Sequence, residues 1–517
     1  MSMVTTRAPS AAPYGPSSSV PFYLTPAAFL CAWVLLGLLC GIGIFTGFHE
    51  LMLLAGILAI PVGLVLLAWP DVATLGVLFV LYTNAAVVAV RFHGVPYAVG
   101  LCVPLLLAVP VARYVIGSRE KIVFTPTLPL VALFVLAQLY SSMFSANPDL
   151  SMNVLTGSLV EGLGLFFLLT NVVRTPRLLR LATWVLLAAG AFMGGLSAIQ
   201  QATGNYDKNY GGFAQMSNAE FETGEQDPEM AHQRRLAGPL GDQNRYAQIM
   251  LMLIPLGMFL SWGESDRRLR YVAMVATGLT AVGLCLAFSR GAAVAFVLML
   301  LTMVLLRYIT WRQFLTVGLG LGLVAVVVPQ YGARLVSLEK LAEAVDEDGA
   351  GINAADGAVR SRYTEMMAAF LMFNDHPFTG VGPGMYPVNY RPYAERVAIS
   401  VKETARQPHT LLLGIAAELG LPGLIAFSTM ILASLLALAR ARRMCLTDAP
   451  EQAHIVAGFM LAIVGYMATA LFLHFAYVRY FWLMLALAEA AAVIARRECL
   501  LAKWHRTLSP ERGLTTE

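Results

Sequence analysis

Two arginines and one histidine in the polar stretches of this chain are the side chains best suited to chemistry. Arg290 lies between two apolar runs with almost no loop, Arg362 opens a helical pattern, and His409 comes just before the apolar run 411–417. A planar guanidinium matches phosphate oxygens two at a time, so arginine can bind a pyrophosphate without a metal. Histidine can accept a proton near neutral pH. Such a set can displace a pyrophosphate leaving group by a hydroxyl, with the developing charge stabilised electrostatically.

Other polar residues flank these three and are candidates for substrate binding. Arg235 and Asn244 precede an apolar run, whereas Arg360, Arg406 and Glu418 share a long polar stretch with Arg362 and His409. The alternative for any one of the arginines is attraction to lipid headgroups. The sequence contains no paired-cysteine site, carboxylate cluster or His-Glu-x-x-His pattern, so we expect neither a catalytic metal nor a cofactor.

Glycine patterns favour structural roles over phosphate binding. Gly380, Gly382 and Gly384 are not followed by Lys-Ser or Lys-Thr, so they predict a tight turn and not a phosphate-binding loop. The glycines at 318, 320 and 322 lie in an apolar run, where small residues are expected to serve helix packing.

The composition places these residues on a membrane protein. Hydrophobic residues make up 58% and charged residues 13% of 517 residues, and the mean hydropathy is +0.68. These values indicate an all-α polytopic membrane protein. Apolar runs of about 17 to 23 residues, enough to cross about 30 Å of hydrocarbon, predict about fourteen transmembrane helices (12–14). They cover residues 26–45, 51–69, 72–91, 98–117, 127–145, 152–173, 178–200, 246–263, 269–288, 291–308, 313–329, 419–439, 452–474 and 478–496.

Basic residues predict how the chain crosses the membrane. With a cytoplasmic N-terminus, the short inner segments hold 20 of the 35 lysines and arginines, whereas the short outer turns hold three. This asymmetry places both termini in the cytoplasm. One medium and one large loop then lie on the outer, periplasmic side. The expected segments are a disordered tail (1–25), an N-terminal bundle (26–200), a periplasmic flap (201–245), central helices (246–329), a catalytic loop (330–418), C-terminal helices (419–496) and a cytoplasmic tail (497–517).

Helical periodicity recurs inside the large loop. Residues 334–345 are predicted to form an amphipathic helix in the membrane interface. A second helix is predicted over 363–373 from the spacing of Met366 and Phe370 with neighbouring apolar residues, and it should end before Pro377. In the flap, residues 207–229 are acidic and rich in glycine and asparagine, which predicts flexibility.

The ordered polar motifs resemble those of the O-antigen ligase and polymerase family. The motifs are Arg235–Asn244, Ser289–Gly291, Arg362 followed by Pro377–Gly384, His409–Leu413 and Glu418–Leu424. The resemblance implies a metal-independent, inverting membrane glycosyltransferase of the GT-C type in the bacterial inner membrane. It implies that Arg290 and Arg362 hold the pyrophosphate of an undecaprenyl pyrophosphate-linked oligosaccharide. His409 would orient or deprotonate the acceptor hydroxyl, and Arg235 would assist either substrate.

Several functions stay open within and beyond this family. A polymerase of O-antigen or exopolysaccharide repeat units is slightly favoured, because Thr410 follows His409 where ligases commonly have asparagine. The alternatives are a ligase that uses a lipid A-core acceptor and a protein O-glycan ligase. Expected partners are membrane lipids, a flippase and a chain-length regulator, with no nucleic acid. A more distant alternative is a secondary transporter, in which Glu161 and Glu489 would couple ions; a purely structural membrane scaffold is the third option.

Overall fold

The structure is a computed structural model that describes residues 69–216, 235–327, 357–401, 406–474 and 478–508. The chain divides into two units, 1–73 and 74–517. Only 69–73 of the first unit are described, and the site belongs to the second unit. The predicted span 26–45, nearly all of 51–69 and the predicted interfacial helix 334–345 lie outside the described residues.

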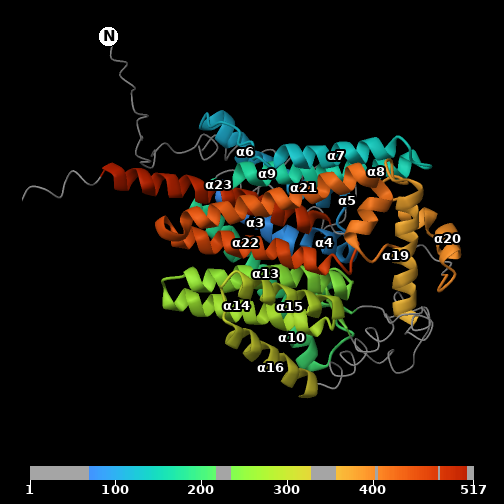
Figure 1. The fold of residues 1–517 in the computed structure, drawn as a ribbon. Helices are drawn as coiled ribbons and strands as arrows, with labels where there is room; N and C mark the ends of the chain where they lie inside the picture. The colour runs from blue at the N-terminus through green and yellow to red at the C-terminus, as the bar shows by residue number, and fades with distance from the viewer. Residues whose placement is uncertain (1–68, 217–234, 328–356, 402–405, 475–477, 509–517) are drawn as a thin grey trace, which may run out of the picture. The chain divides into compact units, whose positions relative to one another are not determined.

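Helices joined by short loops make up almost all of the described chain (Figure 1). In chain order they are α3 (Pro70–Tyr82), α4 (Ala85–His93), α5 (Tyr97–Leu105), α6 (Ala108–Ala112), the π-helical η2 (Arg113–Gly117), α7 (Leu128–Ser142), α8 (Pro148–Gly157), the π-helical η3 (Ser158–Gly164), α9 (Leu165–Val172), α10 (Pro176–Thr203), the 3-10 turn η4 (Tyr210–Gly212), α13 (Gln243–Gly263), α14 (Arg267–Leu286), α15 (Arg290–Leu305), α16 (Trp311–Val327), α19 (Gly357–Asp375), α20 (Tyr386–Val397), α21 (Leu411–Asp448), α22 (Pro450–Thr469) and α23 (Val478–Leu508).

The long apolar helices confirm an all-α polytopic membrane protein. Within the described residues, six helices are long and apolar enough to cross a membrane, and the bent pair α3 and α4 would make a seventh span. Each of the twelve predicted spans from 72–91 onward coincides with helical residues. However, α7 has 15 residues and α15 has 16, which gives a rise of about 22 to 24 Å against a hydrocarbon core of about 30 Å. The count of twelve to fourteen therefore stays a prediction.

The predicted span 72–91 is broken. The axes of α3 and α4 differ by 60°, and Asn84 at the break has a φ of 60°. Its side-chain amide donates to the carbonyl of Pro239 at 3.0 Å and accepts from Arg479 at 2.9 Å. Contacts with two distant parts of the chain thus hold the side chain of Asn84 at the bend.

Burial separates the central helices from the peripheral ones. In the most apolar window of each helix, 83% of α13 and 78% of α22 is buried, but only 22% of α14. A helix that is apolar all round belongs in the core, whereas one with a single buried face lies at the periphery. Helices α10 and α14 approach closely at Gly194, where a Cβ would lie 2.0 Å from the carbonyl oxygen of Leu279. A Cβ at glycines 318, 320 and 322 would meet no atom of the described residues within 4 Å, so their expected role in helix packing stays a prediction.

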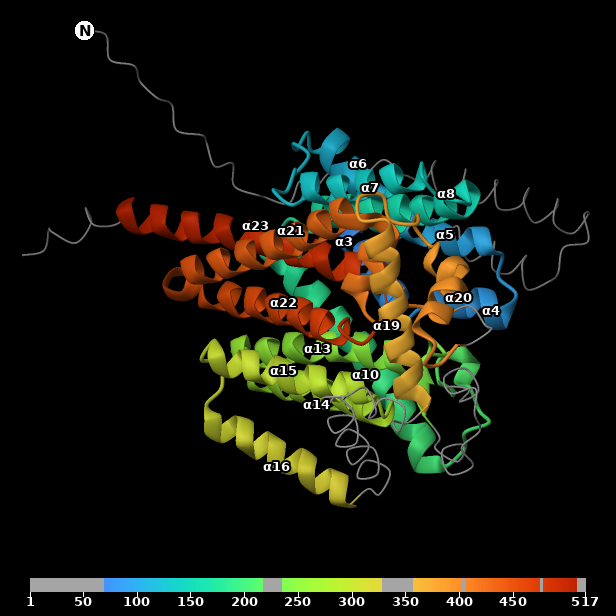
Figure 2. The same ribbon diagram turned by 45° about the vertical axis from the view of Figure 1, so that its right-hand side comes forward.

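The large loop folds against one end of the bundle. Helix α19 runs across the ends of the membrane helices, and α20 lies beside it (Figures 1 and 2). Two corrections concern its limits: the loop helix begins at Gly357, not at 363, and α21 begins at Leu411, not at 419. Helix α21 is broken at Gly420, whose φ of 64° and ψ of −165° suit only glycine.

A two-stranded antiparallel ribbon closes the described ends of the flap. Strand β1 (Gln215–Met216) pairs with β2 (Leu236–Gly238), with Gln215 opposite Gly238. This pair was not predicted, because strands of two and three residues are too short to show a period of two. Residues 217–234, which hold most of the predicted flexible stretch, lie outside the described residues.

Candidate active site

Two of the sequence motifs meet where α13 and α15 begin. Asp242 caps α13 by accepting from the backbone N–H groups of Asn244 and Arg245 at 2.8 and 3.0 Å. Ser289 caps α15, and its hydroxyl donates to the side-chain oxygen of Asn244 at 2.8 Å. Arg290 is the first residue of α15, and it is partly buried. The fold thus brings Asn244 next to the Ser289–Gly291 motif. In the sequence, each of them precedes an apolar run.

A buried carboxylate on α19 faces His409. Oε2 of Glu365 lies 3.2 Å from Nε2 of His409, and the side chain of Glu365 is 1% exposed. Its other oxygen accepts from the hydroxyl of Ser361 at 3.1 Å. Nε of Arg406 lies 3.9 Å from the same oxygen. A carboxylate so placed fixes the orientation of an imidazole ring and stabilises its protonated form.

A hydrogen bond from Tyr386 holds the part of α19 that carries Glu365. The hydroxyl of Tyr386 donates to the backbone carbonyl of Glu365 at 2.6 Å. Burial, reinforced by the nearby Glu365, raises the pKa of Tyr386, so this hydroxyl stays protonated and can donate. Helix α20, which carries Tyr386, therefore supports the segment of α19 that carries Glu365.

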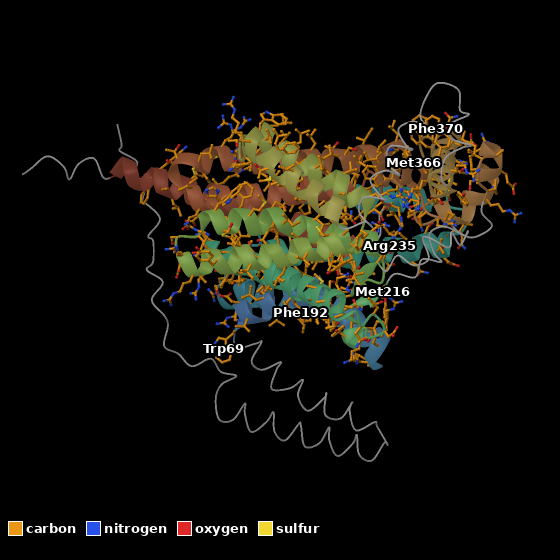
Figure 3. All side chains as sticks on the ribbon, turned by 90° about the horizontal axis from the view of Figure 1, so that it is seen from below. Trp69, Phe192, Met216, Arg235, Met366 and Phe370 are labelled. Atoms are coloured by element: carbon orange, nitrogen blue, oxygen red, sulfur yellow. The ribbon has the colours of Figure 1, made fainter. Side chains whose placement is uncertain are left out.

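Helix α19 does not bury the largest of the apolar residues from which it was predicted. Ala368, Ala369 and Met372 are fully buried. Met366 and Phe370, on which the helix was predicted, are 38% and 50% exposed and lie on the outer side of α19 (Figure 3). The small residues allow α19 to approach the helix ends closely enough for Glu365 to reach His409.

A second histidine lies beside the first. The rings of His409 and His474 are 6.4 Å apart between centroids, at an interplanar angle of 77°. The two segments are tied together because the backbone N–H of Leu411 donates to the carbonyl of Ala470 at 2.9 Å. Burial, then the charge of Arg245, then His409 lower the pKa of His474 well below its ordinary value, so it is neutral at neutral pH.

The glycine-rich segment is a tight turn, as predicted. Gly380, Gly382 and Gly384 have φ values of 65°, 108° and 72°. The backbone N–H of Gly382 donates to the carbonyl of Glu418 at 2.9 Å, and that of Tyr386 donates to the carboxylate of Glu418 at 3.1 Å. Glu418, a candidate for substrate binding, therefore anchors this turn to α21.

The remaining candidate residues lie on elements around this cluster. Arg360 and Arg362 flank Ser361 on α19, and Arg235 directly precedes β2 (Figure 3). All three are partly buried and each takes part in an interaction. Their roles in holding substrate stay predictions.

Three residues of the cluster were missed or set aside at the sequence level: Glu365, Arg245 and His474. Glu365 follows Ser361 by four residues, a spacing that places both on one helical face, but this pair was not singled out among the polar residues of the loop. Arg245 is 1% exposed and donates to Gln248 at 3.3 Å. His474 lies 65 residues from His409 in the sequence, and only the packing of α21 on α22 joins them.

The two acids of the transporter alternative have different surroundings. Glu489 is 1% exposed and accepts from the hydroxyl of Ser434 at 2.7 Å. This is the pairing with a polar neighbour that the structural interpretation predicts. Glu161 is partly buried within η3.

Fold and site together define a multi-pass, all-α membrane protein with a buried histidine–carboxylate cluster where α19 crosses the helix ends. Residues 273–428 match the family model of the O-antigen ligases. This match supports the resemblance to the O-antigen ligase family seen in the motifs of the chain. The matched segment contains Arg290, Arg362, Glu365 and His409. No curated protein matches the chain.

Proposed function

We propose that this protein is an O-antigen ligase of the bacterial inner membrane: a metal-independent, inverting glycosyltransferase of the GT-C type. It transfers a glycan from undecaprenyl pyrophosphate to a hydroxyl of lipid A-core at the periplasmic face. The polymerase was slightly favoured by the sequence, but the family match, described as O-antigen ligase, favours the ligase. The observation that carries the proposal is the buried carboxylate of Glu365, 3.2 Å from His409, inside the matched segment.

The proposed reaction uses the arginines and the histidine in separate roles. The acceptor oxygen attacks the anomeric carbon of the donor, and the bond from that carbon to the pyrophosphate oxygen breaks. The acceptor proton passes to His409, and undecaprenyl pyrophosphate leaves. Arg290 and Arg362 stabilise the charge that develops on the leaving group. Glu365 holds His409 in place and stabilises its protonated form.

Complementation of a deletion strain tests this function. The host's surface polysaccharide is resolved by size after expression of wild type, Arg290→Ala, Arg362→Ala or His409→Ala, with protein levels measured in membranes. Arg391→Ala is the matched control, because Arg391 is an exposed arginine of α20, 62% accessible, that pairs with Glu395. We expect the control to restore the pattern and the other three variants to fail.

The products distinguish the alternatives. Loss of all attached glycan, with polymerised glycan accumulating on undecaprenyl pyrophosphate, supports the ligase. Loss of the long ladder with a single attached repeat remaining indicates a polymerase. Restoration of the wild-type pattern by all three variants would overturn the catalytic assignment. A transporter predicts that Glu161→Gln abolishes function, whereas the ligase predicts that it does not.

A further inference from the structure

A cavity opens beside the two histidines, between α7, the junction of α8 with η3, and the start of α21. Its volume is about 280 Å³. Pro408, which directly precedes His409, lines it, and so does His474. Because His474 contacts the ring of His409, a molecule in this cavity lies next to the proposed proton acceptor.

The charges around the cavity do not suit a pyrophosphate. Among the described residues that line it, the ionisable ones are Glu418 and His474, and neither lysine nor arginine is present. Neither of these two side chains supplies a positive charge that could hold an anionic ligand. The cavity therefore suits a neutral ligand, in contrast to Arg290 and Arg362.

Two polar side chains in the cavity wall are available to a ligand. Gln138 lines the cavity and is 3% exposed. Nδ1 of His474 is buried and has no hydrogen-bonding partner in the described part of the chain. Buried polar groups are nearly always satisfied, so hydroxyl groups of a ligand are the expected partners.

The apolar part of the lining completes the match to a sugar. Phe134, Leu411, Ile415 and Leu419 form one portion of the wall, and Ser158 and Gln407 add polar groups elsewhere. A pyranose ring has the same division, since its C–H faces are apolar and its rim carries hydroxyls. The volume is just below the range of about 300 to 1,000 Å³ typical of pockets for drug-sized ligands, which suits a single ring.

We propose that this cavity binds the sugar that carries the acceptor hydroxyl, and that Gln138 and His474 hydrogen-bond to its rim. The inference rests on the proposed function and deepens it, because it names the cavity and the side chains that would recognise the acceptor sugar. The neutral acceptor would bind in this cavity, and the anionic donor would bind at the arginines outside its lining.

A cavity-filling variant with a matched control tests the proposal. Gly157 lines the cavity, and a Cβ added there meets no atom within 4 Å. Gly195, in α10, has the same open space but does not line the cavity. Gly157→Leu should therefore fill the cavity, whereas Gly195→Leu adds the same side chain elsewhere. Gln138→Leu removes the amide at nearly constant volume.

The assay uses purified full-length protein in nanodiscs. The donor is undecaprenyl pyrophosphate-linked glycan, and the acceptor is the lipid A-core fraction, both isolated from the deletion strain. We expect Gly157→Leu and Gln138→Leu to raise the KM for acceptor about tenfold or more, which corresponds to about 1.4 kcal/mol. The KM for donor should stay within about twofold, and Gly195→Leu should behave as wild type. Thermal unfolding of each variant checks that it folds.

A binding measurement complements the kinetics. The oligosaccharide released from lipid A-core by mild acid should raise the unfolding temperature of wild type but not of Gly157→Leu. An increase in the donor KM alone, or unchanged kinetics in both cavity variants, would overturn the proposal while leaving the transferase intact. A wild-type protein that transfers glycan to no acceptor would instead overturn the proposed function, and the cavity assignment with it.

Discussion

The scaffold formed by α10, α13 and α14 and the loop helix α19 are buried in opposite ways. In α13 nearly every side chain of the apolar window is buried, and α10 and α14 meet at a glycine. Helix α19 buries Ser361, Glu365 and alanines, and it exposes Phe370. The scaffold is thus held by apolar packing, which does not depend on the residues proposed to act on substrate. The position of α19 depends both on a small apolar cluster that includes Ala368, Ala369 and Met372 and on the polar contacts that form the candidate site, so a change in those polar contacts affects fold and function together.

The largest expected effect follows from removing the charge of Glu365. Glu365→Gln keeps the volume but loses the carboxylate facing His409, and we expect transfer to fall about 100-fold or more, the usual scale for general-base assistance. Transfer by purified protein measures it. Glu395→Gln, an exposed change on α20, is the control. Partial recovery by Glu365→Asp would support a positioning role, whereas full activity of Glu365→Gln would contradict it.

Met372 is a large apolar side chain that α19 buries, and truncating it tests how much apolar packing stabilises this helix. Met372 is fully buried, so Met372→Ala should destabilise the protein by about 2 to 5 kcal/mol. Phe370→Ala, at a side chain 50% exposed, should change stability by less than about 0.5 kcal/mol. Thermal unfolding in detergent compares the two. Equal losses would mean that the exposed face of α19 is also packed.

The scaffold has its own matched pair. Gly194→Ala brings a methyl group against the backbone of α14 and should destabilise the protein by about 1 to 3 kcal/mol. The neighbouring Gly195→Ala meets open space, and it should be neutral or slightly stabilising. Recovery of monodisperse protein and its unfolding temperature distinguish them. Similar behaviour of both variants would show that α10 and α14 can separate without cost.

The smallest effect is expected where α19 ends. Asp375 pairs with Arg396 of α20, and the hydrogen bond from Arg396 lowers the pKa of Asp375. A lowered pKa means that the pair contributes at neutral pH and that its contribution disappears as the pH falls through that pKa. Both partners are exposed, so Asp375→Asn should leave the unfolding temperature unchanged within error at pH 7. A clear loss at pH 7 that vanishes in acid would show that this contact orders the loop.

Much of the architecture follows from the sequence because apolar runs leave a strong signal. The helices from residue 72 onward, the tight glycine turn and the end of α19 before Pro377 are all found as predicted. The break at Asn84 was missed because its side chain bonds to residues far away in the chain, Pro239 and Arg479. The apolar pattern does not reveal which face of α19 is buried, because Met366 and Phe370 are exposed whereas Ala368 and Ala369 are buried. Size favours burial only where there is room, and close approach to the helix ends selects alanine.

The candidate site was predicted only in part. Arg290, Arg362 and His409 stood out because of their positions beside apolar or helical runs in segments predicted to lie on the periplasmic side. Glu365 was not singled out by any local pattern, and His474 fits an interfacial or structural role equally well. Their importance arises from contacts between α19, α21 and the end of α22, which no local pattern encodes. Arg290 and Arg362 as pyrophosphate ligands remain predictions.

The break at Gly420 determines how the loop and the helix after His409 can move. Backbone hydrogen bonds join Val381 to Ala417, Gly382 to Glu418 and Leu421 to Pro377, so the turn after α19 is attached on both sides of the break. The first two turns of α21 are therefore hydrogen-bonded to the loop as well as joined to the rest of their own helix. A displacement of α19 would therefore also displace His409. Binding of one substrate to the arginines of the loop would then change the position of the histidine proposed to activate the other substrate.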